Sequence, residues 1–242
     1  MIAEKLLGAK NFPPGTIVIS GKTGAGKTML ALSIMCETIL EGGNAAMITT
    51  DAPPDKLIET CKSIGFDAAG PLQNGTLHFL DCYSWRVGMS GQKERTGIES
   101  VGGMDNLNAL AIKVEELLKT KPRVVVFDSV STLNLHSEEK PVLRFLEVFS
   151  GRIRDIGSTA IIIVELGVQS NGFETILNST SDGRIETKLD EGSGELVCCL
   201  RVAAMGNTRH STKWTRFEIT DKGIEFKEPD FPAPPLPAFF SR

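Results

Sequence analysis

GKTGAGKT, at residues 21–28, matches the P-loop pattern G-x-x-x-x-G-K-[ST] and is the most informative segment for the fold. A β-branched run, TIVIS at 16–20, comes directly before it. Apolar residues then recur at helical spacing from Lys27 to Leu40, and Gly42-Gly43 ends that pattern. A strand, a glycine-rich turn and a helix in this order form the context that a P-loop requires.

The loop predicts a binding site for a nucleoside triphosphate. Its glycines let the main chain approach phosphate oxygens without a Cβ clash, and its N–H groups, together with the start of the helix, supply positive potential. We expect the Lys27 ammonium to bridge the β- and γ-phosphates and the Thr28 hydroxyl to bind Mg²⁺. The predicted nucleotide contacts are Gly21, Thr23, Gly24, Ala25, Gly26, Lys27, Thr28 and Met29.

Two carboxylates end apolar runs further along the chain. The run VVVFD at 124–128 ends in Asp128, which we expect to hold Mg²⁺, often through water. Ser129 follows it, either as a hydroxyl supporting the metal site or as a helix cap. Glu165 ends the run STAIIIVE at 158–165 and is a candidate catalytic residue that senses the γ-phosphate, or else an exposed strand end.

Strand and helix patterns alternate along the chain, which predicts an α/β fold with a mainly parallel sheet and helices on both faces. The predicted strands are 16–20, 45–50, 76–82, 123–128 and 158–165, and the predicted helices are 27–40, 53–64, 104–118 and 141–156. The polar, glycine-rich residues 84–102 are expected to form a long surface loop. Three later runs have the pattern of antiparallel strands that extend or cap the sheet: 184–189, 195–204 and 214–219.

Composition is that of an average soluble protein and argues against several classes. The chain has 242 residues, and 26 basic against 30 acidic residues give a formal net charge of −4. That balance argues against a protein held to nucleic acid mainly by phosphate neutralisation. No apolar run approaches the roughly 18–20 residues that cross a bilayer, and the first residues lack an export signal. We therefore expect a cytoplasmic protein without membrane insertion.

Several stretches besides the P-loop resemble one family, the KaiC-like branch of the RecA/RadA ATPases, whose single-domain members occur largely in archaea. They are PPGTIVISG (13–21), ITTDAPPDKL (48–57), CKSIGFD (61–67), NGTLHFLDC (74–82), VVVFDSVS (124–131) and TRFEITDKGIEF (215–226). The resemblance predicts one domain over residues 1–228. A tail rich in proline and phenylalanine, 229–242, lies outside it.

The resemblance implies several properties of the fold and the site. They are a RecA-like core, ATP and Mg²⁺ as cofactors, and a homo-oligomeric ring, such as a hexamer, with ATP between subunits. It also places Thr220 and Asp221 near the nucleotide of a neighbouring subunit. Asp221-Lys222-Gly223 is equally an ordinary hairpin turn, so both readings stay open here.

Two departures from the family's pattern predict weak hydrolysis. Active members usually carry two adjacent glutamates after the second strand, one of which polarises the attacking water, and here these positions are Asp51 and Ala52. Asp51, a candidate catalytic residue, has a stem one methylene shorter, and Ala52 has no carboxylate. Clock-type members carry a Lys-x-Arg pair that reaches the neighbour's γ-phosphate, where this chain has Ala203 and Met205. Nearby cations that are either replacements or plain surface charges are Arg201, Arg209, His210, Lys213 and Arg216.

These residues favour an ATP-binding protein in which nucleotide controls assembly or the docking of a protein partner, with slow or absent hydrolysis. Two alternatives stay open. A DNA-linked recombinase or motor ATPase needs a basic channel, whereas the loop 87–103 is nearly neutral. A small-molecule P-loop kinase needs an arginine-rich lid, and the sequence has no dense arginine cluster.

Overall fold

Apolar, β-branched runs of the sequence lie side by side as the strands of one sheet in this computed structural model. The structure describes residues 1–88, 95–101, 107–191 and 194–227. Within these residues the strands are β1 (Gly15–Gly21), β2 (Ala45–Thr49), β3 (Leu77–Asp81), β4 (Ile98–Ser100), β5 (Val124–Asp128), β6 (Thr159–Glu165), β7 (Gly183–Asp190), β8 (Val197–Met205), β9 (Thr215–Thr220) and β10 (Gly223–Lys227). The helices there are α1 (Ile2–Leu7), α2 (Lys27–Leu40), α3 (Pro54–Ser63), α4 (Ala69–Asn74), α5 (Tyr83–Arg86), α6 (Leu107–Leu118), α7 (Val130–His136), α8 (Glu139–Asp155) and α9 (Asn171–Thr180).

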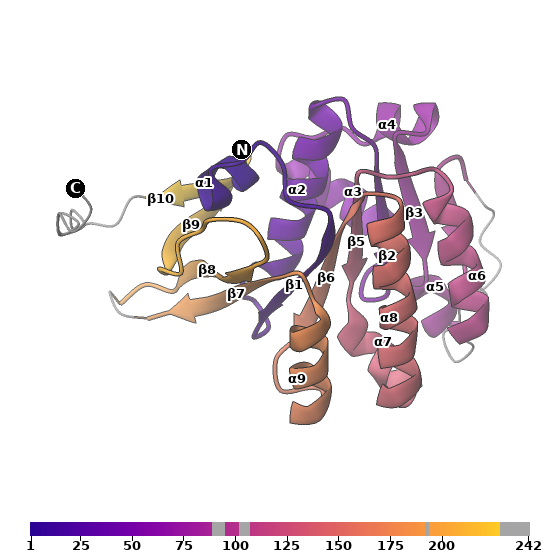
Figure 1. The fold of residues 1–242 in the computed structure, drawn as a ribbon. Coiled ribbons are helices and arrows are strands. Elements are labelled where there is room, and N and C mark those ends of the chain that lie inside the picture. The colour runs from indigo at the N-terminus through magenta and orange to yellow at the C-terminus, as the bar shows by residue number, and fades with distance from the viewer. Residues whose placement is uncertain (89–94, 102–106, 192–193, 228–242) are drawn as a thin grey trace.

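The sheet runs in the order β10-β9-β8-β7-β1-β6-β5-β2-β3-β4 (Figure 1). From β7 to β4 neighbouring strands are parallel, whereas β8, β9 and β10 are antiparallel additions at one end. The predicted α/β fold with a mainly parallel sheet and antiparallel C-terminal strands is therefore confirmed. The later strands extend the sheet through β7, which pairs parallel with β1 and antiparallel with β8.

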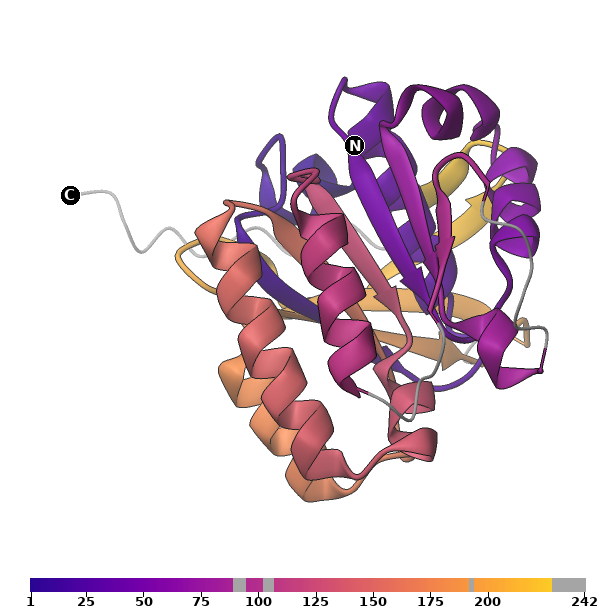
Figure 2. The ribbon, with the colours of Figure 1, turned by 90° about the vertical axis from the view of Figure 1, so that its right-hand side faces the viewer.

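Helices cover both faces of the sheet because buried side chains alternate along its central strands. On one face, Ile17 and Ile19 of β1 belong to the core cluster that includes α1, α2 and α3. On the other, Val18 of β1 and Phe127 of β5 belong to the cluster that includes α6, α7, α8 and α9. Figure 2 shows α6, α8 and α9 side by side on this second face, where α8 packs against both of the others.

Most predicted elements form within a few residues of their expected positions, and α2 has the predicted bounds. The expected surface loop at 84–102 is wrong in part, because Tyr83–Arg86 forms the short helix α5 and Ile98–Ser100 pairs with β3 as β4. Ile98 is buried in the core, but one apolar residue among glycines and polar residues has no periodic pattern to reveal it. The sequence patterns also missed α1, α4, α7 and α9. Residues 89–94, 102–106 and 228–242 lie outside the described ones, and these include parts of the predicted loop and the tail.

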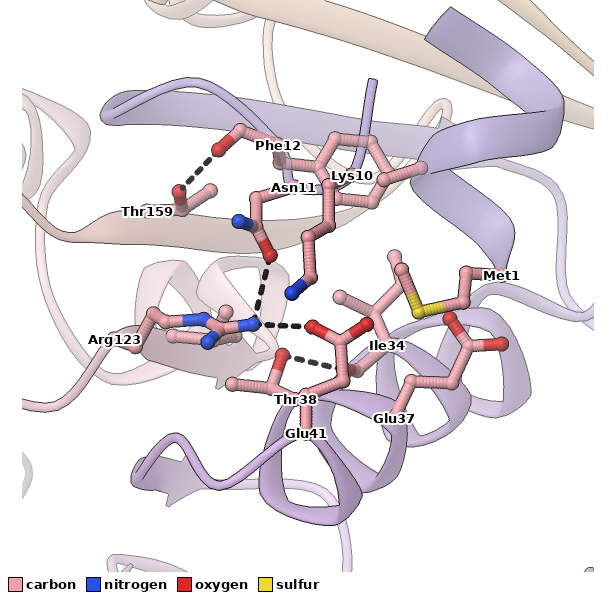
Figure 3. A pocket seen from close by; sticks show the side chains of 12 residues that line it. Met1, Lys10, Asn11, Phe12, Ile34, Glu37, Thr38, Glu41, Arg123 and Thr159 are labelled. Atoms are coloured by element: carbon pink, nitrogen blue, oxygen red, sulfur yellow. Dashed lines mark hydrogen bonds and ion pairs between the residues drawn. The ribbon is translucent and has the colours of Figure 1, made fainter. Parts of the chain in front are cut away.

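A small polar cluster joins the N-terminal segment to the end of α2 (Figure 3). Arg123 precedes β5 and its guanidinium donates a hydrogen bond to Asn11 Oδ1 at 2.7 Å, and it also pairs with the Glu41 carboxylate. Thr159 donates to the carbonyl of Pro13 at 3.0 Å. The cavity beside this cluster has a volume of about 30 Å³, which suits a single water molecule rather than a nucleotide.

Candidate nucleotide-binding site

The P-loop joins β1 to α2 through two glycines with left-handed backbone, Gly24 and Gly26, both at φ 80°. Residues with a Cβ rarely adopt that conformation. At Gly26 a second constraint acts, because a Cβ there would lie 2.8 Å from Cζ of Phe217, a ring that is almost fully buried. At Gly21 a Cβ would lie 2.2 Å from Thr187 Oγ1. The glycines are therefore required by close packing against the later strands as well as by the turn.

The strand order brings the predicted acidic residues to the P-loop. Gly21 at the end of β1 lies opposite Glu165 at the end of β6, and Thr49 at the end of β2 lies opposite Asp128 at the end of β5. The carboxyl ends of these four parallel strands meet at one edge of the sheet, where α/β proteins bind their ligands. Asp51 lies two residues past the end of β2 and lines the cavity at the same edge.

A cavity of about 360 Å³ opens at this edge, in the size range of ligand pockets. Six of the predicted nucleotide contacts line it: Thr23, Gly24, Gly26, Lys27, Thr28 and Met29. Asp51, Asp128 and Glu165 line it as well. Gly21 and Ala25 are buried and do not line the cavity, so any contact of these two residues with the nucleotide would come from their main-chain groups.

Thr28 and Asp128 form the pair predicted to bind Mg²⁺. The Thr28 hydroxyl donates a hydrogen bond of 2.8 Å to Asp128 Oδ2, so a hydroxyl and a carboxylate oxygen lie side by side below the cavity. Burial raises the pKa of Asp128 to about 6, and the carboxylate charges of Asp51 and Glu165 add to this rise, whereas the Thr28 hydrogen bond and the Lys27 charge oppose it. Oxygen ligands of this kind fit Mg²⁺, which usually keeps other positions for phosphate and water.

Glu165 contacts the P-loop itself. Its Oε2 lies 2.7 Å from Lys27 Nζ, and its Oε1 accepts a hydrogen bond of 2.8 Å from the Thr23 hydroxyl. The ammonium of Lys27 also donates to the carbonyl of Lys22 at 2.9 Å. Glu165 is therefore more than an exposed strand end, because its side chain contacts Thr23 and Lys27. Its role in sensing the γ-phosphate remains a prediction.

The first turn of α7 holds Asp51. Ser129 Oγ donates to Asp51 Oδ2 at 2.9 Å, and the Thr132 hydroxyl donates to Oδ1. Ser129 also caps α7 by accepting a hydrogen bond from the Thr132 N–H, so the helix cap is present, while its support of the metal site stays a prediction. In the same turn, Ser131 Oγ accepts a hydrogen bond of 2.7 Å from the N–H of Glu165.

Thr132 and Ser131 were missed by the sequence reasoning. The signal available was the run DSVST at 128–132, in which hydroxyl residues occupy the cap and the second and third positions of a helix that follows a carboxylate. Short hydroxyl side chains are common at such positions as plain caps. The contacts of Thr132 with Asp51 and of Ser131 with Glu165 become visible only when the neighbouring strand ends are placed beside α7.

Thr220 and Asp221 do not line the cavity, although Ile219, next to them in β9, does. They form the turn between β9 and β10, where the Thr220 hydroxyl accepts a hydrogen bond from the N–H of Lys222. The Asp221 carbonyl lies beside Gly65, where a Cβ would be 2.9 Å away. The predicted hairpin turn is thus present. Contact with a neighbouring subunit's nucleotide stays a prediction.

The segment with Ala203 and Met205 departs from regular strand alternation. A bulge against β7 pairs Arg184 with Ala204 and Ile185 with Val202, so Ala203 has no partner of its own. Met205 is buried, and its sulfur would lie 2.6 Å from a Cβ built on Gly183. An arginine at 205 therefore enters the core instead of pointing outward, and the substitution is no simple way to restore a cation here.

Arg201, one of the nearby cations, is already engaged within the chain. Its Nε donates to Glu186 Oε2 at 2.7 Å, and its guanidinium lies 4.7 Å from the ring centre of Trp214. Glu186 lies in β7 and Trp214 directly precedes β9, so two neighbours in the same chain hold this side chain. Use of Arg201 at another subunit's phosphate would require breaking these contacts.

Comparisons with known proteins show the family of this chain and identify similar proteins in archaea and in Thermotoga. A family model described as ATPase: KaiC matches residues 6–230. A UPF0273 protein of Aeropyrum pernix is 29% identical over 214 residues, covering 86% of this chain and 83% of that protein. A UPF0273 protein of Thermotoga maritima is 27% identical over 212 residues, covering 86% of this chain and 85% of that protein.

A solved structure supports the RecA-like fold. A KaiC-like protein from Pyrococcus horikoshii superimposes with a TM-score of 0.75 at 22% identity, covering 93% of this chain and 94% of the other. At that identity the likeness concerns the fold alone. In the part of the chain that the structure describes, no helix is long and apolar enough to span a bilayer.

Proposed function

Because this chain belongs to the KaiC family of ATPases, we propose that it binds ATP with Mg²⁺ in this cavity, as a cytoplasmic ring-forming protein. ATP occupancy controls its assembly or the docking of a protein partner, and hydrolysis is slow. The observation that carries the proposal is the hydrogen bond between Thr28 and Asp128 beside the buried Lys27, at the open end of a glycine loop. The residue types at these positions are those that P-loops use for triphosphate and Mg²⁺.

The chain's own groups divide the work of binding. The loop N–H groups and the start of α2 receive phosphate oxygens, and Lys27 neutralises the β- and γ-phosphates. Thr28 and Asp128 supply oxygen ligands to Mg²⁺, which offsets phosphate charge when bound. The Phe217 ring packs closely against Gly26 and supports the P-loop backbone. We therefore expect the loop to have its phosphate-binding shape before ATP enters.

Slow hydrolysis has two supports in this site. Both oxygens of Asp51 already accept hydrogen bonds, from Ser129 and Thr132, so this shorter side chain is held at the first turn of α7. Ala52 offers no second carboxylate. A cation supplied by a neighbouring subunit is worth about 10³–10⁵ in rate in GTPases, and Ala203 and Met205 provide none.

The first test is nucleotide binding by the full chain, measured by calorimetry with ATP and Mg²⁺. Lys27→Ala removes the ammonium that contacts phosphate, and we expect affinity to fall about tenfold or more while the fold is retained. Lys119→Ala, at an exposed position just past the end of α6, removes the same charge away from the cavity and is the matched control. Unchanged affinity in Lys27→Ala would exclude the P-loop assignment.

Assembly and turnover separate the proposal from its alternatives. Light scattering with and without ATP–Mg²⁺ should show a larger particle with nucleotide, and a phosphate-release assay should show slow turnover. Turnover that is strongly stimulated by DNA, together with DNA binding at moderate salt, favours a recombinase or motor instead. Transfer of the γ-phosphate to a small molecule without assembly favours a kinase.

A further inference from the structure

The buried ammonium of Lys27 has a carboxylate partner from another strand. The Lys27 side chain is only 7% exposed, and an unpaired charge at such a position is strongly destabilising. Glu165 supplies the opposite charge at 2.7 Å. Helix α2, which begins at Lys27, has no acidic residue in its first turn, so its own sequence does not provide this partner.

Glu165 is held at the P-loop by more than this ion pair. One carboxylate oxygen pairs with Lys27 and the other accepts from Thr23, so both oxygens face the loop. The N–H of Glu165 donates to Ser131, which fixes the strand end from which the side chain extends. A quarter of the Glu165 side chain is nevertheless exposed, so the carboxylate has water to turn towards.

A triphosphate requires the same ammonium that Glu165 already contacts. Among the described residues that line the cavity, Lys27 is the one cation, and three carboxylates line the same cavity: Asp51, Asp128 and Glu165. Two anions that compete for one ammonium oppose each other's binding, and the repulsion is strong where water is partly excluded.

We propose that Glu165 is an internal counter-ion of the P-loop, which the phosphates of ATP displace from Lys27 and Thr23 on binding. The carboxylate stabilises the nucleotide-free state and thereby weakens ATP binding. This inference rests on the proposed function, since it assigns Glu165 a role at the same site. It differs from a sensing role, in which Glu165 contributes a favourable contact to bound ATP.

The proposal predicts opposite effects in the two states of the protein. Glu165→Gln removes the negative charge and keeps the size of the side chain. Without nucleotide, Lys27 loses its counter-ion, so the melting temperature should fall. With saturating ATP–Mg²⁺ the repulsion is gone, so affinity should rise about fivefold or more and the ATP-induced rise in melting temperature should grow.

The control is Glu174→Gln, which removes one charge from α9, where Glu174 accepts a hydrogen bond from the Gly167 N–H and does not line the cavity. We expect its ATP affinity to equal that of the wild type. Glu165→Ala removes the same carboxylate and should shift affinity in the same direction, which keeps the test decisive if the amide variant is unstable.

Calorimetry on the full chain decides the outcome. Tighter ATP binding in both Glu165 variants, with no change in the control, supports the proposal. Equal or weaker binding in the Glu165 variants, with wild-type binding that depends on Lys27, overturns this inference and leaves the proposed function intact. Absence of ATP binding in the wild type overturns both.

Discussion

Helix α2 carries an ion pair at each end, and the two pairs lie in different surroundings. At its start, Lys27 pairs with Glu165 beside a cavity of about 360 Å³. Just past its end, Glu41 pairs with Arg123 beside a cavity of about 30 Å³. Both charges on the helix have the sign that its dipole disfavours, a cation at the start and an anion at the end. Each is compensated by an opposite charge from elsewhere in the chain, Glu165 at the end of β6 and Arg123 just before β5.

The two ends of α2 differ in the space beside each ion pair, and therefore in whether a ligand can replace one of its partners. Arg123 is held by Glu41 and Asn11 in a space that admits little more than water, so its charge serves the fold. Glu165 is held by Lys27 and Thr23 at the mouth of a larger cavity, where a phosphate can take its place. The same kind of pair is thus a structural clamp at one end and a replaceable contact at the other.

The largest expected difference concerns the glycines that flank α2. Gly26 and Gly42 both have left-handed backbone, with φ of 80° and 78°, but a Cβ at Gly26 meets Phe217 whereas a Cβ at Gly42 meets nothing within 4 Å. We expect Gly26→Ala to lower the free energy of unfolding by about 2–4 kcal/mol, from strain and overpacking, and Gly42→Ala by about 1–2 kcal/mol, from strain alone.

Urea denaturation of both variants measures this difference in stability. We also expect Gly26→Ala, but not Gly42→Ala, to weaken ATP binding, which calorimetry measures. Equal losses of stability at the two glycines would mean that Phe217 does not constrain the P-loop.

The next effect concerns the clamp at the far end of α2. Arg123→Ala leaves the largely buried Glu41 carboxylate without its partner, and we expect the free energy of unfolding to fall by about 1–2 kcal/mol. ATP affinity should stay unchanged, because the clamp lies at the opposite end of the helix from the cavity.

Arg152→Ala is the matched control for the clamp. It breaks a 2.7 Å contact with Glu115 between two half-exposed side chains, and such pairs contribute less than about 1 kcal/mol. Weaker ATP binding in Arg123→Ala would contradict the division of roles between the two ends.

The smallest effect concerns Asp51. Thr132→Val keeps the shape of the side chain but removes one of the three hydroxyls, those of Thr50, Ser129 and Thr132, that bond the Asp51 carboxylate. If Asp51 directs the attacking water, turnover should fall about three- to tenfold with ATP affinity unchanged, since misplacement of a catalytic group lowers rate more than binding. Thr132→Ser keeps the hydroxyl and should retain the wild-type rate.

Single-turnover measurements with excess protein detect this change even when steady-state turnover is slow. A valine variant as fast as the wild type would show that Asp51 does not need this hydroxyl. A fall in both rate and affinity would place the effect in the fold of α7 instead.

Local patterns were reliable where one short segment contains all of the interacting groups. The P-loop is such a case, because a strand, a glycine turn and a helix within 16–40 specify the backbone, and with it the predicted phosphate contacts. The alternation of strands and helices likewise predicted a parallel sheet. Periodicity failed where an element is short or lacks a continuous apolar face, as in β4 and in α7.

Contacts between distant segments could not be read from the chain. Thr23 and Glu165 are 142 residues apart, and Asp51 and Thr132 are 81 apart, and each pair meets because strands from separate βα units end at one edge. The bulge that buries Met205 is another such feature, since it depends on how β8 pairs with β7.

The α/β class, the P-loop and the candidate acidic residues Asp51, Asp128 and Glu165 follow from the amino-acid sequence, because glycine freedom and carboxylates at strand ends are local properties of the chain. The tertiary structure alone decided their partners. Strand order placed Glu165 on Lys27 instead of in solvent, and the first turn of α7 beneath Asp51. Electrostatic interactions act through space rather than along the chain, so the charge balance of this cavity exists only once the sheet has formed.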